Sequence, residues 1–399
     1  MAPAPRIARI YSVVAGVAAV TVSMAQSATG QGVPPIVLHN DSSLKAVLGM
    51  RMQDRFTYLH TAGAGQQADA ADFQVRRFRL RMEGHAITPR LQYKVQLGLS
   101  DRDVSIGDGA TSVLMDAMVL YQAGKNTRLG FGQGKLPGGR LALISSGAME
   151  LPERALANGA FTAERDRGIQ LEQAFPAGKQ ALHVHLAASQ GEGRSGQRGA
   201  PGSCYTGRLE WMPFGEFRGN GAYTEGDLER EPAPKLALAA AYNTDRNALR
   251  ARAQNGPLLP DGQARTIGTF YADAMFKYRG WAWLCEFDRR LAHGDPWAND
   301  TATHVSVAVN VGWGLTNQAS RMVGKCSQLA VRHSMVRYDA TVRPAYDDRD
   351  EVLLGWSYFL HDHCIKLQSA VLYEWGEGDA DLSHAGNQFG FMFQVELGI

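Results

Sequence analysis

Arginine residues recur at every second position in one short segment of this chain. Arg77, Arg79 and Arg81 alternate with apolar residues, and Arg51 and Arg55 precede them on a similar alternating segment. Side chains two residues apart lie on the same face of a β-strand. Guanidinium groups stay charged and bind oxyanions through a planar fork of donors. The spacing therefore predicts a wall that guides or binds anions, with these residues as candidates: Arg51, Arg55, Arg77, Arg79, Arg81, Lys94 and Lys135.

A second group of charged residues lies in Leu136–Arg167, a long stretch without strand-like alternation. A connection of this length is functional or disordered, and its apolar content favours a loop folded against the rest of the protein. Both acidic and basic side chains occur in it. We therefore expect them to neutralise one another locally and to produce no strong field that attracts anions. A charge-paired polar wall remains the alternative to selective phosphate binding. The candidates in this stretch are Arg140, Glu150, Glu153, Arg154, Arg165, Asp166 and Arg167.

Other patterns do not indicate an enzyme or a cofactor. Gly191–Gly196 matches GxGxxG, but no helix is expected after it. A dinucleotide site needs such a helix, because its N-terminus binds the pyrophosphate. His361 and His363 share a strand face without a third ligand, and the same holds for His183 and His185. We therefore expect no catalytic residues, no cofactor and no metal site.

Composition excludes several classes of protein. The chain has 399 residues, with 41 Lys+Arg against 39 Asp+Glu, which argues against a nucleic-acid binder. A hydrophobic fraction of 45% is enough to fold. Four cysteines without a CxxC pair exclude a disulfide-dense scaffold and a zinc motif.

The N-terminus has the pattern of an export signal. Arg6 and Arg9 precede an uncharged run, Tyr11–Val22, and small residues follow at a cleavage site after Ala25. The run is too short to span a membrane as a helix, which takes about 20 residues. We expect residues 1–25 to be a signal peptide and residues 26–43 an N-terminal segment. Without the signal the chain keeps 39 basic and 39 acidic side chains.

Strict alternation of apolar and polar residues dominates the remainder, residues 44–399. Seventeen segments qualify as strands, for example Leu44–Leu59 and Gln388–Gly398. Because single-chain bacterial barrels have even strand numbers, we expect sixteen, with Glu216–Gly226 as the weakest candidate.

A soluble secreted sandwich and a membrane barrel both alternate in this way. The segments are longer than the five or six residues usual in soluble sheets. Their polar faces carry charges, as the wall of a water-filled lumen would, and Tyr and Trp lie toward the ends of the apolar faces. The sequence therefore predicts an all-β transmembrane antiparallel barrel of about 16 strands, wide enough for an aqueous channel.

Three stretches also carry a resemblance to a known family. Phe73–Gly84 (FQVRRFRLRMEG), Leu114–Tyr121 (LMDAMVLY) and Gly132–Gln170, with GQGKLPGG, ELPERALANGAF and ERDRGIQ in order, resemble the phosphate-selective porin O and P family. The resemblance implies a 16-stranded barrel, usually trimeric, with an inward-folded constriction loop. Phosphate-specific members use arginine ladders and a lysine cluster. This chain has the ladder and Lys135 at the matching GK position, but no lysine cluster.

The resulting hypothesis is a Gram-negative outer-membrane porin for passive diffusion of small hydrophilic solutes, with small anions or phosphate as candidates. Expected partners are outer-membrane lipid, two further copies in a homotrimer, and the insertion machinery. The last would read the terminal strand, which carries Phe389, Phe391 and Phe393 but ends in Ile399. A barrel-scaffold enzyme of lipase or protease type and a non-conducting structural barrel are the alternatives.

Overall fold

The computed structural model describes residues 36–63, 69–107, 110–194, 196, 202–376, 380 and 384–399. The expected signal peptide, residues 1–25, lies outside the described residues. Among the described residues no helix is long and apolar enough to cross a membrane.

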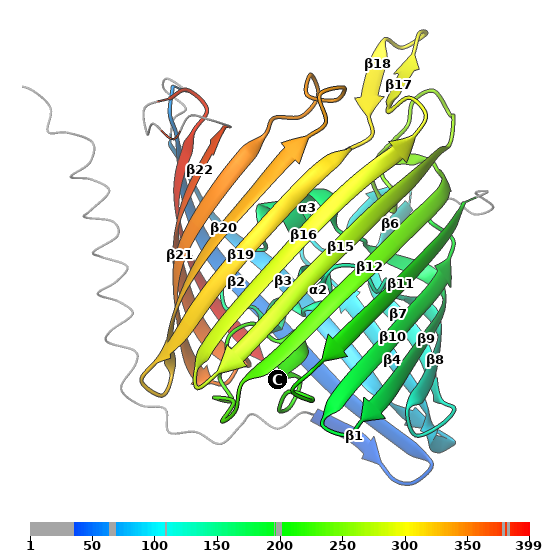
Figure 1. Ribbon diagram of the computed structural model, residues 1–399, viewed down its shortest axis with the longest axis vertical. Helices are drawn as coiled ribbons and strands as arrows, with labels where there is room; N and C mark the ends of the chain where they lie inside the picture. Colours follow the sequence, from blue (N-terminus) through cyan, green and yellow to red (C-terminus); the bar gives the residue numbers. More distant parts are fainter. Residues whose placement is uncertain are drawn as a thin grey trace, which may run out of the picture.

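Sixteen antiparallel strands form a closed, strongly tilted barrel (Figure 1). The number expected from the alternation is confirmed. The strands are β2 (Leu44–Thr61), β3 (Asp69–Ala86), β4 (Thr88–Gly98), β7 (Leu114–Gln122), β8 (Thr127–Lys135), β9 (Arg165–Ala177), β10 (Gln180–Ser189), β11 (Ser203–Met212), β12 (Lys235–Ala248), β15 (Arg265–Tyr278), β16 (Trp281–His293), β19 (Gly312–Val323), β20 (Ser327–Tyr338), β21 (Arg349–His361), β22 (Ile365–Gly376) and β23 (Gln388–Gly398).

The first and last of these strands close the ring. β2 pairs with β23 from Arg51↔Gly398 to Thr61↔Gln388. Below this seam the edge of β2 is covered by β1 (Ile36–Asn40), which pairs with Val47 and its neighbours. β1 thus extends the sheet past the end of β23, and the closed ring does not include it.

The two faces of the wall have opposite character. In β15 the inward side chains, including Thr269, Asp273 and Lys277, are buried, whereas Phe270 on the outward face is exposed. Large apolar side chains such as Phe131 and Leu354 are exposed on other strands. Apolar outside and polar inside is the arrangement of a barrel in lipid.

Apart from the connection between β11 and β12, the long and the short connections lie at opposite rims (Figure 1). Tight turns join β3 to β4, β9 to β10 and β15 to β16 at one rim. The other rim carries the longer connections, with three small hairpins: β5–β6 (Ser105–Gly107, Ala110–Ser112), β13–β14 (Arg250–Arg252, Asn255–Leu258) and β17–β18 (Trp297–Asp300, Val305–Ala308).

Glu216–Gly226, the seventeenth predicted strand, is not a strand. It belongs to a long connection from β11 to β12 at the short-turn rim, which contains the 3-10 helix η3 (Gly221–Tyr223). Its apolar residues Phe217 and Ala222 pack inside the barrel rather than against lipid, so their spacing imitates a strand without forming one.

Gly84 in β3 has no room for a side chain, because an added Cβ would lie 1.7 Å from the carbonyl oxygen of Lys45 on β2. Backbone cannot yield as a side-chain end can, and overpacking commonly costs about 1–3 kcal/mol. We expect Gly84→Ala to lower the fraction of protein that reaches the compact, heat-modifiable form on electrophoresis. Gly376→Ala, where an added Cβ meets nothing within 4 Å, is the matched control and should fold as the wild type. Equal yields would contradict the tight approach.

Candidate functional site

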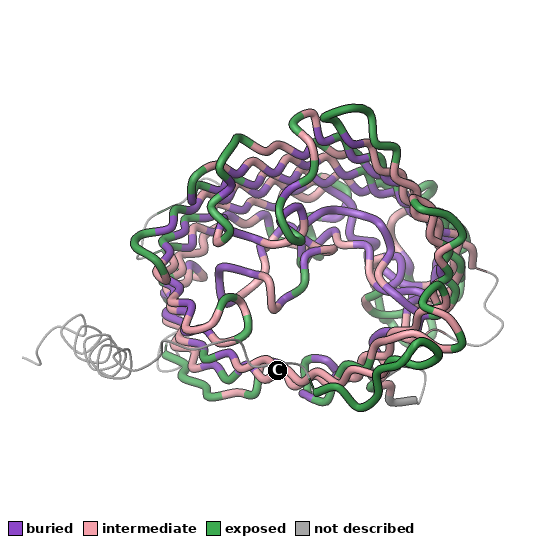
Figure 2. Tube along the Cα trace, turned by 90° about the horizontal axis from the view of Figure 1, so that it is seen from below, coloured by how far each residue is buried: buried purple, intermediate pink, exposed green. Residues whose placement is uncertain are grey.

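Two connections, one from each rim, meet inside the barrel, and Figure 2 shows chain segments within the ring of the wall. The one from β8 to β9 contains α2 (Arg140–Leu143), η2 (Ser146–Ala148) and α3 (Leu156–Phe161). The other is the β11–β12 connection. Their backbones join where Glu225 N donates to Ala148 O at 2.9 Å, and Leu141, Met149 and Phe217 share one apolar cluster. The two connections, residues 136–164 and 213–234, therefore form a layer inside the lumen, called the inner layer below.

Buried ion pairs fasten this layer to one side of the wall. Arg140 of α2 contacts Glu210 of β11, and its Nε lies 2.7 Å from Asp273 Oδ1 of β15. Arg208 Nη1 lies 2.6 Å from Asp273 Oδ2. All four side chains are inaccessible to solvent. Since an unpaired buried charge is very costly, these groups hold α2 in place together.

Two further arginines of the same side bind the backbone of the layer. Arg290 of β16 donates to the carbonyl oxygens of Ala160 and Phe161, at the carboxyl end of α3. Arg332 of β20 donates to the carbonyl oxygen of Glu153 at 2.7 Å. Cations at the carboxyl end of a helix satisfy its free carbonyls, so Arg290 stabilises that end of α3, and Arg332 fixes the segment before it.

On the opposite side, Glu153 is the acceptor for three arginines. Its carboxylate lies 2.6 Å from Arg55 Nη1, 2.8 Å from Arg76 Nε and 3.4 Å from Arg77 Nη2. Burial alone would raise its pKa, but the guanidinium groups of Arg77 and Arg76 outweigh burial and hold the pKa of Glu153 well below its usual range. The carboxylate is therefore ionised at neutral pH.

Arg76 was missed by the sequence analysis, which placed only the odd positions of β3 in the lumen. A bulge explains the difference, because Gln53 pairs with Arg77 while Asp54 pairs with Val75. A bulge leaves one residue unpaired and re-aims its side chain. The sequence carried a signal: the apolar residues of this strand change from odd positions, such as Val75, to even ones, beginning at Phe78.

The other ladder residues also line the lumen. Arg79 binds both carboxylate oxygens of Asp103 and donates to Ser146 Oγ at 3.1 Å. Arg51 donates to Ser145 Oγ and Ser146 Oγ of the inner layer. Arg81 is half exposed and lies 3.3 Å from Glu83. The ladder thus runs from buried guanidinium groups with carboxylate or hydroxyl partners to an open one.

A cavity of about 330 Å³ lies between this ladder and the inner layer. Three acidic side chains line it, Asp103, Asp116 and Glu164. Ten basic ones do so: Arg76, Arg77, Arg79, Arg81, Lys94, Arg102, Lys135, Arg154, Arg165 and Arg194. Basic side chains therefore outnumber acidic ones in the lining, although Glu153 and Glu83, outside it, pair with three of them. Arg102 and Arg194, from loops at the long-connection rim, were not foreseen.

The remaining predicted residues are placed at the edges of this cavity or away from it. Lys94 and Arg165 pair with Asp116, and Lys135 donates to the three carbonyls that end α2. Arg154 donates to the carbonyls of Leu141 and Ile144. Asp166 accepts from Gly191 N and Gly193 N, and Arg167 donates to Gln133. Arg140 and Glu150 lie on the far side, in contacts that fasten the layer.

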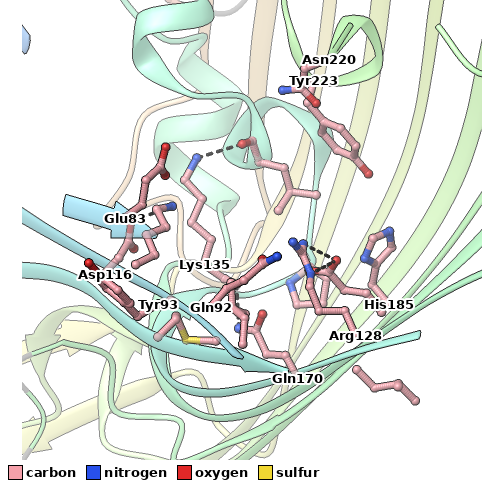
Figure 3. Close-up of a pocket in the computed structure, with 18 of the residues that line it drawn as sticks. Glu83, Gln92, Tyr93, Asp116, Arg128, Lys135, Gln170, His185, Asn220 and Tyr223 are labelled. Carbon is pink, nitrogen blue, oxygen red and sulfur yellow. Dashed lines mark hydrogen bonds and ion pairs between the residues drawn. The ribbon is translucent and has the colours of Figure 1, made fainter. Parts of the chain in front are cut away.

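A larger cavity of about 800 Å³ continues toward the short-turn rim. Lys94, Asp116 and Lys135 line both cavities, so the two spaces are contiguous. Figure 3 shows Arg128 and His185 on the strand wall and Tyr223 on the inner layer across from them. The larger cavity therefore adjoins the one beside the arginine ladder, with polar side chains at their boundary.

A closed barrel with an apolar exterior and a polar, partly open lumen defines the class of membrane channels. The family model for the phosphate-selective porins O and P matches residues 47–255, and the chain belongs to that family. It is an outer-membrane channel for passive diffusion. No curated protein matches the sequence.

Solved structures share the fold at low identity. The anion-selective porin from Comamonas acidovorans is 12% identical, with a TM-score of 0.58 over 90% of this chain and 100% of that one. OmpF of Salmonella typhi, in complex with daunomycin, is 11% identical, with a TM-score of 0.56 over 91% and 100%. The channel DcaP of Acinetobacter baumannii is 12% identical, with a TM-score of 0.54 over 89% and 98%.

Removing the charge of Glu153 should leave three lumenal guanidinium groups without their shared counter-ion. We expect Glu153→Gln to move the reversal potential in a KCl gradient toward the chloride equilibrium potential, because the field along the ladder becomes more positive. Asp54→Asn removes an exposed carboxylate from the outward face of β2 and serves as the charge-matched control. A shift of equal size in both variants would show that Glu153 does not act on permeating ions.

Glu150 and Glu225 join the two connections, and both accept from Gln318 Nε2, at 2.6 Å and 3.0 Å. Burial and the neighbouring Glu225 raise the pKa of Glu150 to about 7. A carboxyl with a raised folded-state pKa destabilises the fold as pH rises through that value. Between pH 6 and 8 the wild type should lose about 1 kcal/mol of stability. The conversion temperature of the heat-modifiable band measures it, and Glu150→Gln should reduce the pH dependence by about this amount. An unchanged dependence would place the titrating group elsewhere.

Proposed function

We propose that this channel prefers anions, with phosphate and similar oxyanions among its solutes. The observation that carries the proposal is the cavity beside the ladder, with its ten basic and three acidic side chains. In a narrow space with low-dielectric walls, an excess of fixed positive charge raises the local concentration of anions and repels cations.

The ladder also has the chemistry to recognise oxyanions. Asp103 occupies the fork of Arg79, and Ser146 adds a hydroxyl donor or acceptor beside it. The Glu153 carboxylate occupies a nest of three guanidinium groups. These internal carboxylates mark positions where an oxyanion is held by planar forks, and a phosphate oxygen has the same requirements.

Two groups remain available to a passing solute. Within the residues that the structure describes, the one ion pair of Arg81 is with Glu83 at 3.3 Å, and more than half of its side chain is exposed. Arg102 is exposed and has no ion pair recorded within the described part of the chain. A solute can therefore bind these cations without breaking a buried pair. One structural neighbour is an anion-selective porin, but at 12% identity that likeness supports the fold, and the proposal rests on the cavity.

We further propose that the predicted loop, residues 136–167, is the constriction that sorts solutes by size, although its last three residues begin β9 and only residues 136–164 form the connection. Its contacts with Arg51, Arg79 and Lys366 of the barrel wall support this role. Residues 1–25 would direct export, β23 would be read by the insertion machinery, and three copies would assemble in the Gram-negative outer membrane.

Planar bilayer recording of the purified protein tests the preference. We expect a reversal potential of the anion-selective sign in a KCl gradient and a chloride current that falls as phosphate is added. The double variant Arg81→Gln, Arg102→Gln should weaken phosphate block by about tenfold, the worth of one charge-assisted hydrogen bond. Arg321→Gln, on the outward face of β19 over Trp281, is the control and should behave as the wild type.

A large current without anion preference and without response to phosphate would contradict the proposal and indicate a general porin. Phosphate block that persists unchanged in the double variant would move the site to the buried part of the ladder.

A further inference from the structure

Two histidines of β10 face the larger cavity, away from the arginine ladder. His183 and His185 are two residues apart on the lumenal face. The sheet register sets Glu210 of β11 directly opposite His183, and Glu172 of β9 directly opposite His185. From the sequence alone these histidines lacked a third ligand. The neighbouring strands supply carboxylates that sequence spacing could not reveal.

The distances bring the three groups within reach of one ion. A ligand atom of His183, one of His185 and a carboxylate oxygen of Glu210 all lie within 4.8 Å of one another. Ligand atoms of a tetrahedral zinc site are about 3.4 Å apart, given Zn–N distances of about 2.0–2.1 Å. Side-chain rotations that move these atoms by about one ångström would bring them to the separations of a zinc site.

The hydrogen bonds around the two imidazoles leave a place for an ion. His185 Nε2 is buried and has no hydrogen-bond partner among the described residues. His183 Nε2 lies 2.6 Å from Glu216 Oε1. A carboxylate on one ring nitrogen is the usual outer partner of a metal-binding histidine, because it orients the ring and fixes the tautomer.

Charges of both signs surround the group. Arg208 is directly opposite His185 but is bound to Asp273, and Arg140 is bound to Glu210 and Asp273. Tyr223 donates to the second oxygen of Glu210 at 2.6 Å. A carboxylate offers about four lone-pair positions, so Glu210 keeps acceptor capacity for an ion. Glu172, bound to Arg128, and Glu216 add negative charge near the histidines.

We propose that His183, His185 and Glu210 form a binding site for a divalent transition-metal ion in the lumen, with Glu216 as the residue that orients His183. Imidazole with carboxylate selects zinc, copper and nickel over calcium and magnesium. Water fills the remaining positions, since the site faces an open cavity. A bound ion there narrows the solute path and adds two positive charges next to it.

Calorimetric titration of ZnCl2 into the purified, untagged protein in detergent tests binding directly. We expect one site per chain, with affinity reduced at least tenfold in His183→Gln and in His185→Gln and abolished in the double variant. Glu216→Gln should weaken binding by roughly 10–100-fold, the usual effect of removing an outer partner. His333→Gln is the matched control, because His333 lies on the outward face of β20 and should leave binding unchanged.

Calorimetry measures binding whether or not the pore prefers anions, so this test is independent of the proposed function. The compact, heat-modifiable form confirms that each variant folds. Zinc should also lower single-channel conductance in the wild type and not in the double variant. Absence of zinc binding in the wild type, or binding that survives in the folded double variant, would overturn the proposal.

Discussion

The ion pairs of Arg140 with Glu210 and Asp273 are the interaction on which the lumen depends. They are inaccessible to solvent, and they connect α2 to β11 and β15 at a depth where an unpaired charge would be very costly. Arg140 Nη1 also donates to Ala222 O of the β11–β12 connection at 2.6 Å. One guanidinium group therefore holds both inward connections against the same wall.

Because the layer is fastened on that wall, the opposite side of the lumen is left to the arginine ladder. Many carboxylates of the wall and the layer are taken up in fastening, as with Glu210 and Asp273, or in internal contacts, as with Glu150 and Glu225. The cavity that remains is strongly basic although the whole chain is nearly neutral. Selectivity in such a channel follows from where charges are paired, which net charge does not reveal.

The same architecture places two kinds of candidate site in two adjoining cavities. The cavity beside β3 presents guanidinium groups, which suit oxyanions, and the cavity beside β10 presents imidazoles with carboxylates, which suit transition metals. Lys94, Asp116 and Lys135 stand between them and line both. A metal ion bound at His183 and His185 would lie in the cavity that adjoins the ladder.

Alternation in the sequence was sufficient for the barrel, its polar lumen and the inward direction of Arg77, Arg79 and Arg81, because side-chain direction in a strand is local and has a period of two. The sequence did not reveal Arg76 as a partner of Glu153, since a bulge breaks that period, nor the pairing of Arg140 with Glu210, which are 70 residues apart. The alternation wrongly predicted a strand at Glu216–Gly226, because the apolar residues of this segment pack inside the barrel with a spacing that resembles that of a strand. Which charges neutralise one another was decided only when strands and connections distant in the chain came together, because Coulomb interactions depend on distance in space.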